Sequence, residues 1–213
     1  MNIRTPLQPT TLPMLLGTAE TRLRRQSRYA RPLAKGGRRA AGIEALLNQA
    51  LACVATLAQP TSVVMPVKTV VAGDNVRIAN RIDLNSPDLA CDLASGGTLS
   101  VYLLSLSFDQ SRAFDWLGRD YAAHHVQSDL SGEVLFALGR QVFQDQRDRL
   151  PAGKRLKRVP VQTSDICGQS RIWDPAKVQV LLGVLGAENP GVSVTDTGCF
   201  QPLNSILGLT LAV

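Results

Sequence analysis

The chain has 213 residues, of which 45% are hydrophobic and 19% are charged. This composition is typical of a globular domain large enough to bury a core, and it excludes a disordered chain. Its apolar runs are far shorter than the roughly 20 residues needed to span a bilayer. Pro6, Pro9 and Pro13 interrupt the stretch where a secretory signal would need an apolar run. We therefore expect a cytoplasmic protein without a membrane partner.

The positive charge is concentrated at the N-terminus. Residues 1–40 carry nine basic side chains and one acid, Glu20, whereas the whole chain has a net charge of +6. The rest of the chain is therefore slightly acidic. We predict a basic, Pro- and Arg-rich arm at residues 1–40, with a short helix at 18–29, and a single domain at residues 41–213. A solvated tail, contact with an acidic partner and contact with nucleic acid remain open roles for the arm.

From residue 42 onward, hydrophobic periodicity and turn residues predict an alternation of helices and strands. Helices are expected at 42–57, 87–93, 110–125, 129–149 and 175–185, and Ser86 followed by Pro87 predicts an N-cap and first helical residue for the second of them. Strands are expected at 62–65, 68–71, 76–82, 99–107, 159–161, 192–194 and 206–211. Because the order lacks a regular strand–helix repeat, we predict an α+β fold with a mostly antiparallel, twisted sheet and flanking helices.

Four cysteines are spread along the chain without a close pair, namely Cys53, Cys91, Cys167 and Cys199. Structural zinc sites usually contain closely paired ligands, so we expect reduced thiols and no metal site. Cys53 and Cys91 fall within apolar helical patterns, which predicts that both are small core residues.

The two histidines, His124 and His125, are adjacent. Neighbouring side chains on a helix point about 100° apart, so this pair is not suited to hold one metal ion. A half-exposed helix end and a histidine that titrates near neutral pH are both compatible with the pattern. No Ser-His-Asp arrangement or phosphate-binding glycine loop is present, and we predict no catalytic residues.

Two carboxylates, Asp129 and Glu133, are four residues apart in a predicted helix. This spacing places them on one helical face. The helix dipole also favours a glutamate in a first turn, which is an alternative explanation for Glu133.

A glycine turn follows that helix, in the stretch that contains Cys167, Gly168 and Gln169. Ser164 precedes these residues and Arg171 follows them. Near Arg171, Cys167 is either a reactive thiolate or a small residue that fits a tight turn.

The order of acidic helix, glycine turn, helix and apolar C-terminal segment resembles the reactivation domain of cobalamin-dependent methionine synthase. That family binds S-adenosylmethionine and carries an Arg-x-x-x-Gly-Tyr signature, at whose positions this chain has Ser164, Gly168 and Gln169. The resemblance implies that Asp129 and Glu133 hold the ligand's amino group. It also implies that the turn, including Cys167 and Arg171, lines the rest of the ligand.

The resemblance implies a stand-alone reactivation component of a corrinoid-dependent methyltransferase system in methionine biosynthesis. Such a protein binds S-adenosylmethionine and presents its methyl group to reduced cobalamin carried by a partner protein. The partner would be a corrinoid protein or a cobalamin-dependent methyltransferase, and we do not expect nucleic acid. The alternative is a non-catalytic accessory protein of the same fold that docks on such a partner without binding S-adenosylmethionine. Whether the chain is itself an enzyme stays open between these two interpretations.

Overall fold

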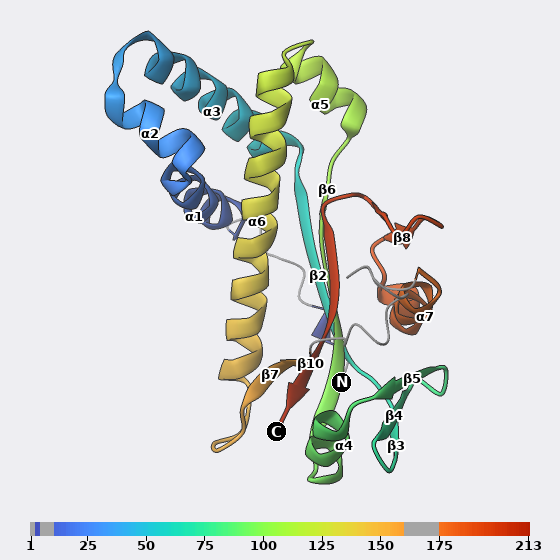
Figure 1. Ribbon diagram of the computed structural model, residues 1–213. Coiled ribbons are helices and arrows are strands. Elements are labelled where there is room, and N and C mark those ends of the chain that lie inside the picture. The colour runs from blue at the N-terminus through green and yellow to red at the C-terminus, as the bar shows by residue number, and fades with distance from the viewer. Residues whose placement is uncertain (1–2, 5–10, 160–174) are drawn as a thin grey trace. The chain divides into compact units, whose positions relative to one another are not determined.

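The computed structural model describes residues 3–4, 11–159 and 175–213 (Figure 1). The helices are α1 (Thr11–Arg25), α2 (Ser27–Lys35), α3 (Gly37–Leu57), α4 (Pro87–Ala94), α5 (Gln110–Leu117), α6 (Tyr121–Asp148), α7 (Pro175–Leu185) and the short 3-10 helix η2 (Gly186–Glu188). The strands are β1 (Ile3–Arg4), β2 (Gln59–Pro66), β3 (Thr69–Ala72), β4 (Asn75–Ile78), β5 (Ile82–Asn85), β6 (Thr98–Ser107), β7 (Leu156–Val159), β8 (Ser193–Val194), β9 (Phe200–Gln201) and β10 (Ser205–Ala212).

The chain divides into two compact units, each assembled from separate stretches of sequence. Unit 1 takes its described residues from 1–5, 62–104 and 142–213, and unit 2 takes them from 6–61 and 105–141. Residue 40, where the sequence suggested a boundary, therefore lies inside unit 2. Strands β2 and β6 and helix α6 each begin in one unit and end in the other.

Unit 1 contains most of the sheet structure. Its main sheet has the strand order β1-β2-β6-β10-β7, in which β1 with β2 and β7 with β10 pair antiparallel. A second sheet is the antiparallel meander β3-β4-β5, and β8 pairs with β9. The predicted α+β fold with antiparallel sheets and flanking helices is confirmed.

The β4–β5 hairpin shows how side-chain alternation builds the core of unit 1. Val76 and Leu84 are directly paired and buried, whereas the neighbouring pair Arg77 and Asp83 is exposed. The Arg77 Nε donates to the Asp83 carboxylate at 2.7 Å. This alternation is the expected pattern of a sheet with one buried face. The buried face joins a core that also includes Leu99, Val101 and Leu103 of β6 and Val178, Leu181 and Leu185 of α7.

An aromatic side chain packs closely against a glycine in the main sheet. A Cβ atom built on Gly208 of β10 would lie 2.7 Å from Tyr102 Cε1, which is closer than real Cβ contacts allow. The Tyr102 ring also meets Phe143 edge to face, with 5.1 Å between centroids, and Arg158 stacks on the Phe143 ring. Burial raises the pKa of the Tyr102 phenol. Glycine is needed at 208 because the tyrosine ring occupies the side-chain space.

Unit 2 is helical. Helix α3 contacts α1, α2 and α5, and it buries one face, made of Leu47, Ala50, Cys53, Val54 and Leu57. Among the described helices, α3 alone is long and apolar enough to meet the length and composition of a membrane span. A helix that contributes to a protein core passes the same test.

Residues 11–35 form two helices with buried side chains, which differs from the solvated tail considered for the arm. Leu15, Leu16, Ala19 and Leu23 of α1 and Tyr29 of α2 are all buried. Pro13 lies in the first turn of α1, where a missing backbone N–H removes no helical hydrogen bond. The helices pack because the apolar residues recur at helical spacing despite the basic composition around them.

An arginine of α1 links these helices to α3. The two terminal nitrogens of Arg24 donate to the two carboxylate oxygens of Glu44 at 2.7 and 2.8 Å. The Arg24 Nε donates to Glu20 at 2.8 Å. These charge-assisted bonds raise the pKa of Arg24 and lower the pKa of Glu44, so both groups stay charged over a wide pH range.

The expected boundary between helices 110–125 and 129–149 was wrong. Gly118, with φ of 63°, ends α5, and α6 then runs without a break through residues 126–128. The Asp120 side chain accepts from the backbone N–H groups of Ala122 and Ala123 at 2.9 and 3.2 Å. The glycine stop and the aspartate cap place the break earlier than the apolar periodicity suggested.

Two further expectations failed and two were confirmed. The expected single strand at 76–82 is interrupted at residues 79–81, where a turn with positive φ at Ala79 and Asn80 separates β4 from β5. Cys53 is buried as expected, but Cys91 is exposed because it lies on the outer face of α4. The expected cap of α4 is present, since Ser86 Oγ accepts from the Leu89 N–H at 3.4 Å.

Candidate functional site on helix α6

Asp129 and Glu133 lie well inside α6, so Glu133 is not the first-turn glutamate that the sequence left as an alternative. Both carboxylates are directed toward α2, and their partners in the described chain lie on α2, on α6 or at Gln26, the N-cap residue of α2. We call this set the α2–α6 cluster; its members are Gln26, Arg28, Tyr29, Asp129 and Glu133.

The two carboxylate oxygens of Asp129 are both engaged. Arg28 Nη2 lies 2.9 Å from Oδ1, and the Tyr29 hydroxyl donates a short hydrogen bond to Oδ2. His125 Nε2 lies 3.8 Å from the same Oδ2. Tyr29 is only 5% exposed, and burial together with the hydrogen bond to Asp129 raises the pKa of its phenol well above the usual range. Asp129 therefore anchors α2 to α6.

Only one of the two carboxylate oxygens of Glu133 has a hydrogen-bond partner among the described residues. Its Oε1 accepts a hydrogen bond from Gln26 Nε2 at 2.9 Å, whereas its buried Oε2 has no hydrogen-bond partner among the described residues. Arg140, two helical turns further along α6, also has a buried nitrogen, Nη2, without such a partner. Burial and the charge of Arg22 lower the pKa of Arg140, and the charge of Glu133 opposes this shift.

The α2–α6 cluster thus leaves one strong acceptor available. Three of the four carboxylate oxygens of Asp129 and Glu133 are held by Gln26, Arg28 and Tyr29, and the fourth, Glu133 Oε2, is buried and has no partner among the described residues. A buried carboxylate oxygen without a donor is costly, so the site favours a cationic hydrogen-bond donor. An ammonium group fits that requirement at Glu133. It fits Asp129 only if Arg28 or Tyr29 withdraws.

The other predicted ligand residues cannot be placed against this cluster. Ser164, Cys167, Gly168, Gln169 and Arg171 lie outside the described residues. Their predicted roles stay predictions that rest on the sequence.

The adjacent histidines have different surroundings. His124 stacks on Phe114 with 5.5 Å between ring centroids, and its Nε2 lies 2.9 Å from the Gly118 carbonyl oxygen. His125 borders the cluster, 3.5 Å from Arg28 Nη1. His124 therefore supports the α5–α6 corner, and His125 lies at the edge of the Asp129 ion pair.

Three cluster members, Gln26, Arg28 and Tyr29, were not predicted from the sequence as site residues. Tyr29 is separated from Asp129 by 100 positions, so no local spacing connects them. The available signal was a single aromatic residue among arginines in a basic segment. A large apolar side chain in such a segment indicates a packed helix more than a free arm.

These elements define a protein of the α+β class, in which antiparallel sheets and helices form a fold of the methionine synthase reactivation-domain type. In particular, the chain is similar to the protein in the crystal structure of the MetH reactivation domain bound to AdoHcy, with a TM-score of 0.62 and 12% sequence identity. The similarity covers 99% of this chain and 78% of that one. At this identity the likeness shows the fold alone. The sequence matches no protein-family model and no curated protein.

Proposed function

We propose that the protein is a reactivation component for a corrinoid-dependent methyltransferase and binds S-adenosylmethionine. The observation that carries the proposal is the similarity, over 99% of the chain, to a reactivation domain that was crystallised with AdoHcy, the demethylated form of that ligand. The buried Glu133 Oε2, which accepts no hydrogen bond from another described residue, supports it, because the ligand's ammonium group needs such a partner on leaving water.

In this function the chain binds and orients its ligand. Glu133 would hold the amino group, and the turn with Ser164, Cys167, Gly168, Gln169 and Arg171 would line the remainder. S-adenosylmethionine supplies a methyl group, and the cobalamin of a partner protein supplies the centre that accepts it. The protein would contribute by orienting S-adenosylmethionine toward the cobalamin, so no catalytic acid or base is needed.

Calorimetric titration of the full chain with S-adenosylmethionine tests this function. We expect saturable binding that Glu133→Gln weakens about tenfold or more, since a charged hydrogen bond is lost. Asp148→Asn, at the exposed end of the same helix, is the matched control and should bind like the wild type. Gln26→Ala should tighten binding, because the amide no longer competes for the Glu133 carboxylate.

The contacts of α2 favour a second candidate, a non-catalytic accessory protein that docks on a corrinoid protein or a cobalamin-dependent methyltransferase. The side chains of Gln26, Arg28 and Tyr29 occupy most of the predicted ligand carboxylates. The family's Arg and Tyr positions hold Ser164 and Gln169 instead. Absence of S-adenosylmethionine binding in the wild type and in Gln26→Ala, together with saturable association with such a partner, would establish this second function and reject the first.

A further inference from the structure

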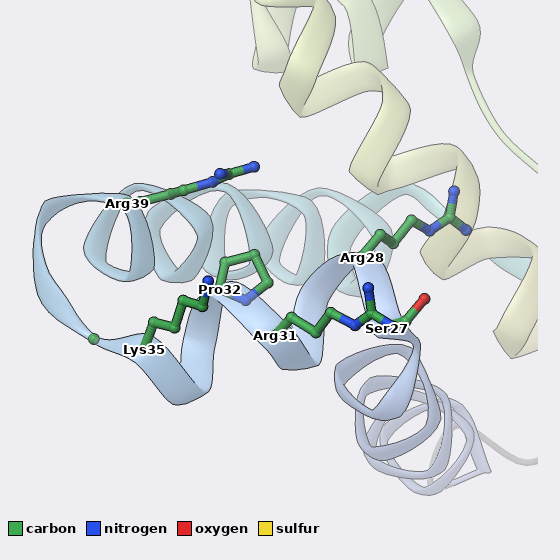
Figure 2. A pocket seen from close by; sticks show the side chains of 7 residues that line it. Ser27, Arg28, Arg31, Pro32, Lys35 and Arg39 are labelled. Atoms are coloured by element: carbon green, nitrogen blue, oxygen red, sulfur yellow. The ribbon is translucent and has the colours of Figure 1, made fainter.

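A concave surface between α2 and the start of α3 collects positive charge. The pocket has a volume of about 510 Å³. Four cationic side chains line it, Arg28, Arg31 and Lys35 from α2 and Arg39 from α3 (Figure 2). None of its lining residues in the described chain is acidic. The volume falls within the roughly 300–1,000 Å³ of small-ligand pockets, so both size and charge suit a compact anion.

Most of this charge has no acidic partner in the part of the chain that the structure describes. Arg28 is paired with Asp129 at the cluster on α6. Arg31, Lys35 and Arg39 have no ion pair or hydrogen bond from their side chains to other described residues, in contrast to Arg24, which is held by two glutamates. Like charges gathered in one hollow repel each other, and a bound anion would remove that repulsion.

The start of α3 adds to the positive potential. Gly36, which lines the pocket, and Gly37 both have positive φ, of 67° and 77°, and form the tight turn between the helices. No side chain caps α3, and its first turn contains no acid. The N-terminal end of a helix carries partial positive charge and exposes N–H groups that bind anions. Arginines at 38 and 39 are therefore unfavourable there unless an anion is bound.

We propose that this pocket binds the phosphate groups of a small ligand, of the size of a diphosphate or triphosphate. Guanidinium groups form bidentate bonds with phosphate, and a helix N-terminus supplies further donors. The pocket is concave, and Tyr29, the aromatic residue within the basic segment, is buried and so cannot stack on a nucleic-acid base. Both observations favour a small phosphate ligand over nucleic acid. The proposal does not depend on S-adenosylmethionine binding.

Neighbouring arginines provide a matched test. Arg39 lines the pocket, whereas the adjacent Arg38 is exposed outside it. The full-length wild type, Arg39→Gln and Arg38→Gln would be titrated calorimetrically with inorganic tripolyphosphate at constant ionic strength. We expect saturable binding by the wild type, a loss of about tenfold or more in Arg39→Gln and a much smaller loss in Arg38→Gln. Circular dichroism and thermal unfolding would verify that both variants fold.

A nucleoside triphosphate would be titrated in parallel to separate two sources of the same phosphate chemistry. If the nucleoside triphosphate binds with the same affinity as tripolyphosphate, the phosphates alone are recognised. If it binds more tightly, the nucleoside adds contacts. Either result agrees with the proposal, provided that Arg39→Gln lowers the affinity. Equal losses in the two variants would indicate general attraction to a basic surface and overturn the proposal. No saturable tripolyphosphate binding, or binding only to long duplex DNA, would also overturn it.

Discussion

The Tyr29 hydroxyl donates a hydrogen bond to the Asp129 carboxylate, and this contact joins residues that are 100 positions apart in the chain. The same carboxylate is paired with Arg28, so two consecutive side chains of α2 are held by one acid of α6. Because Tyr29 is buried, the contact combines apolar packing with a charge-assisted hydrogen bond. It holds α2 against Asp129, one of the two carboxylates that the sequence assigned to a ligand.

Replacing Tyr29 by phenylalanine should destabilise the protein. The substitution keeps the buried ring but removes the hydrogen bond to Asp129, and we expect a loss of about 1–3 kcal/mol in the free energy of unfolding. Urea denaturation followed by circular dichroism measures it. Tyr121→Phe is the control, because Tyr121 is 90% exposed and its hydroxyl has no hydrogen-bond partner among the described residues. Equal effects of the two substitutions would contradict the role given to Tyr29.

The same tyrosine should make the protein sensitive to alkali. Its pKa in the folded state is raised by burial and by Asp129, whereas in the unfolded chain it returns to its ordinary value of 10.0. The stabilising contribution is therefore complete below pH 10 and is lost as the pH rises toward the raised pKa. Unfolding measured from pH 9 to 12 should show a steeper fall in stability for the wild type than for Tyr29→Phe. Parallel curves would show that Tyr29 is not the group responsible.

At acid pH the stability that the Arg24–Glu44 pair contributes should be lost as the pH falls. Hydrogen bonds from Arg24 lower the pKa of Glu44 below its ordinary value of 4.5, so the pair stabilises the fold above that pH. This contribution is lost as the pH falls through the lowered pKa. We expect Arg24→Gln to reduce stability at pH 7. We also expect its stability to change less with pH between pH 5 and 2 than that of the wild type. Thermal unfolding across this range provides the measurement, with Arg25→Gln as an exposed control. If the stability of Arg24→Gln varied with acid pH as steeply as that of the wild type, the role given to the Arg24–Glu44 pair would be wrong.

Alanine at position 208 should be poorly tolerated. Its Cβ would overlap the Tyr102 ring, and overpacking of this kind costs about 1–3 kcal/mol. Gly132→Ala is the matched control, since a Cβ there meets no atom within 4 Å and the residue lies inside α6. That control should be neutral or stabilise the protein by up to about 1 kcal/mol. Chemical denaturation of the two variants distinguishes packing from a general effect of replacing glycine.

Local signals in the sequence predicted the elements that depend on local interactions. The Ser86-Pro87 cap identified the start of α4, and the apolar run of residues 99–107 identified β6. The helix at 11–25 was obscured because the N-terminal forty residues are rich in proline and arginine, although the leucines of this stretch recur at helical spacing. The length of α6 depended on a glycine stop and an aspartate cap, which hydrophobic periodicity does not detect.

The candidate site was predictable only in part for the same reason. The four-residue spacing of Asp129 and Glu133 is a local property of one helix, and it correctly placed both carboxylates on a shared face. Their engagement by Gln26, Arg28 and Tyr29 depends on contacts between distant segments. Such contacts follow from tertiary packing, which no spacing within a short motif encodes.

The two units are interleaved along the sequence, since the described chain alternates between them and passes through β2, β6 and α6 on the way. No single terminal deletion can therefore separate one unit from the other. Removing residues 1–40 as a basic arm would take away α1 and α2, including five buried side chains, and leave Asp129 and Glu133 without their partners from Gln26, Arg28 and Tyr29. Loss of activity in such a truncation would report damage to the fold. Single substitutions with matched controls are thus the informative route to assigning roles in this protein.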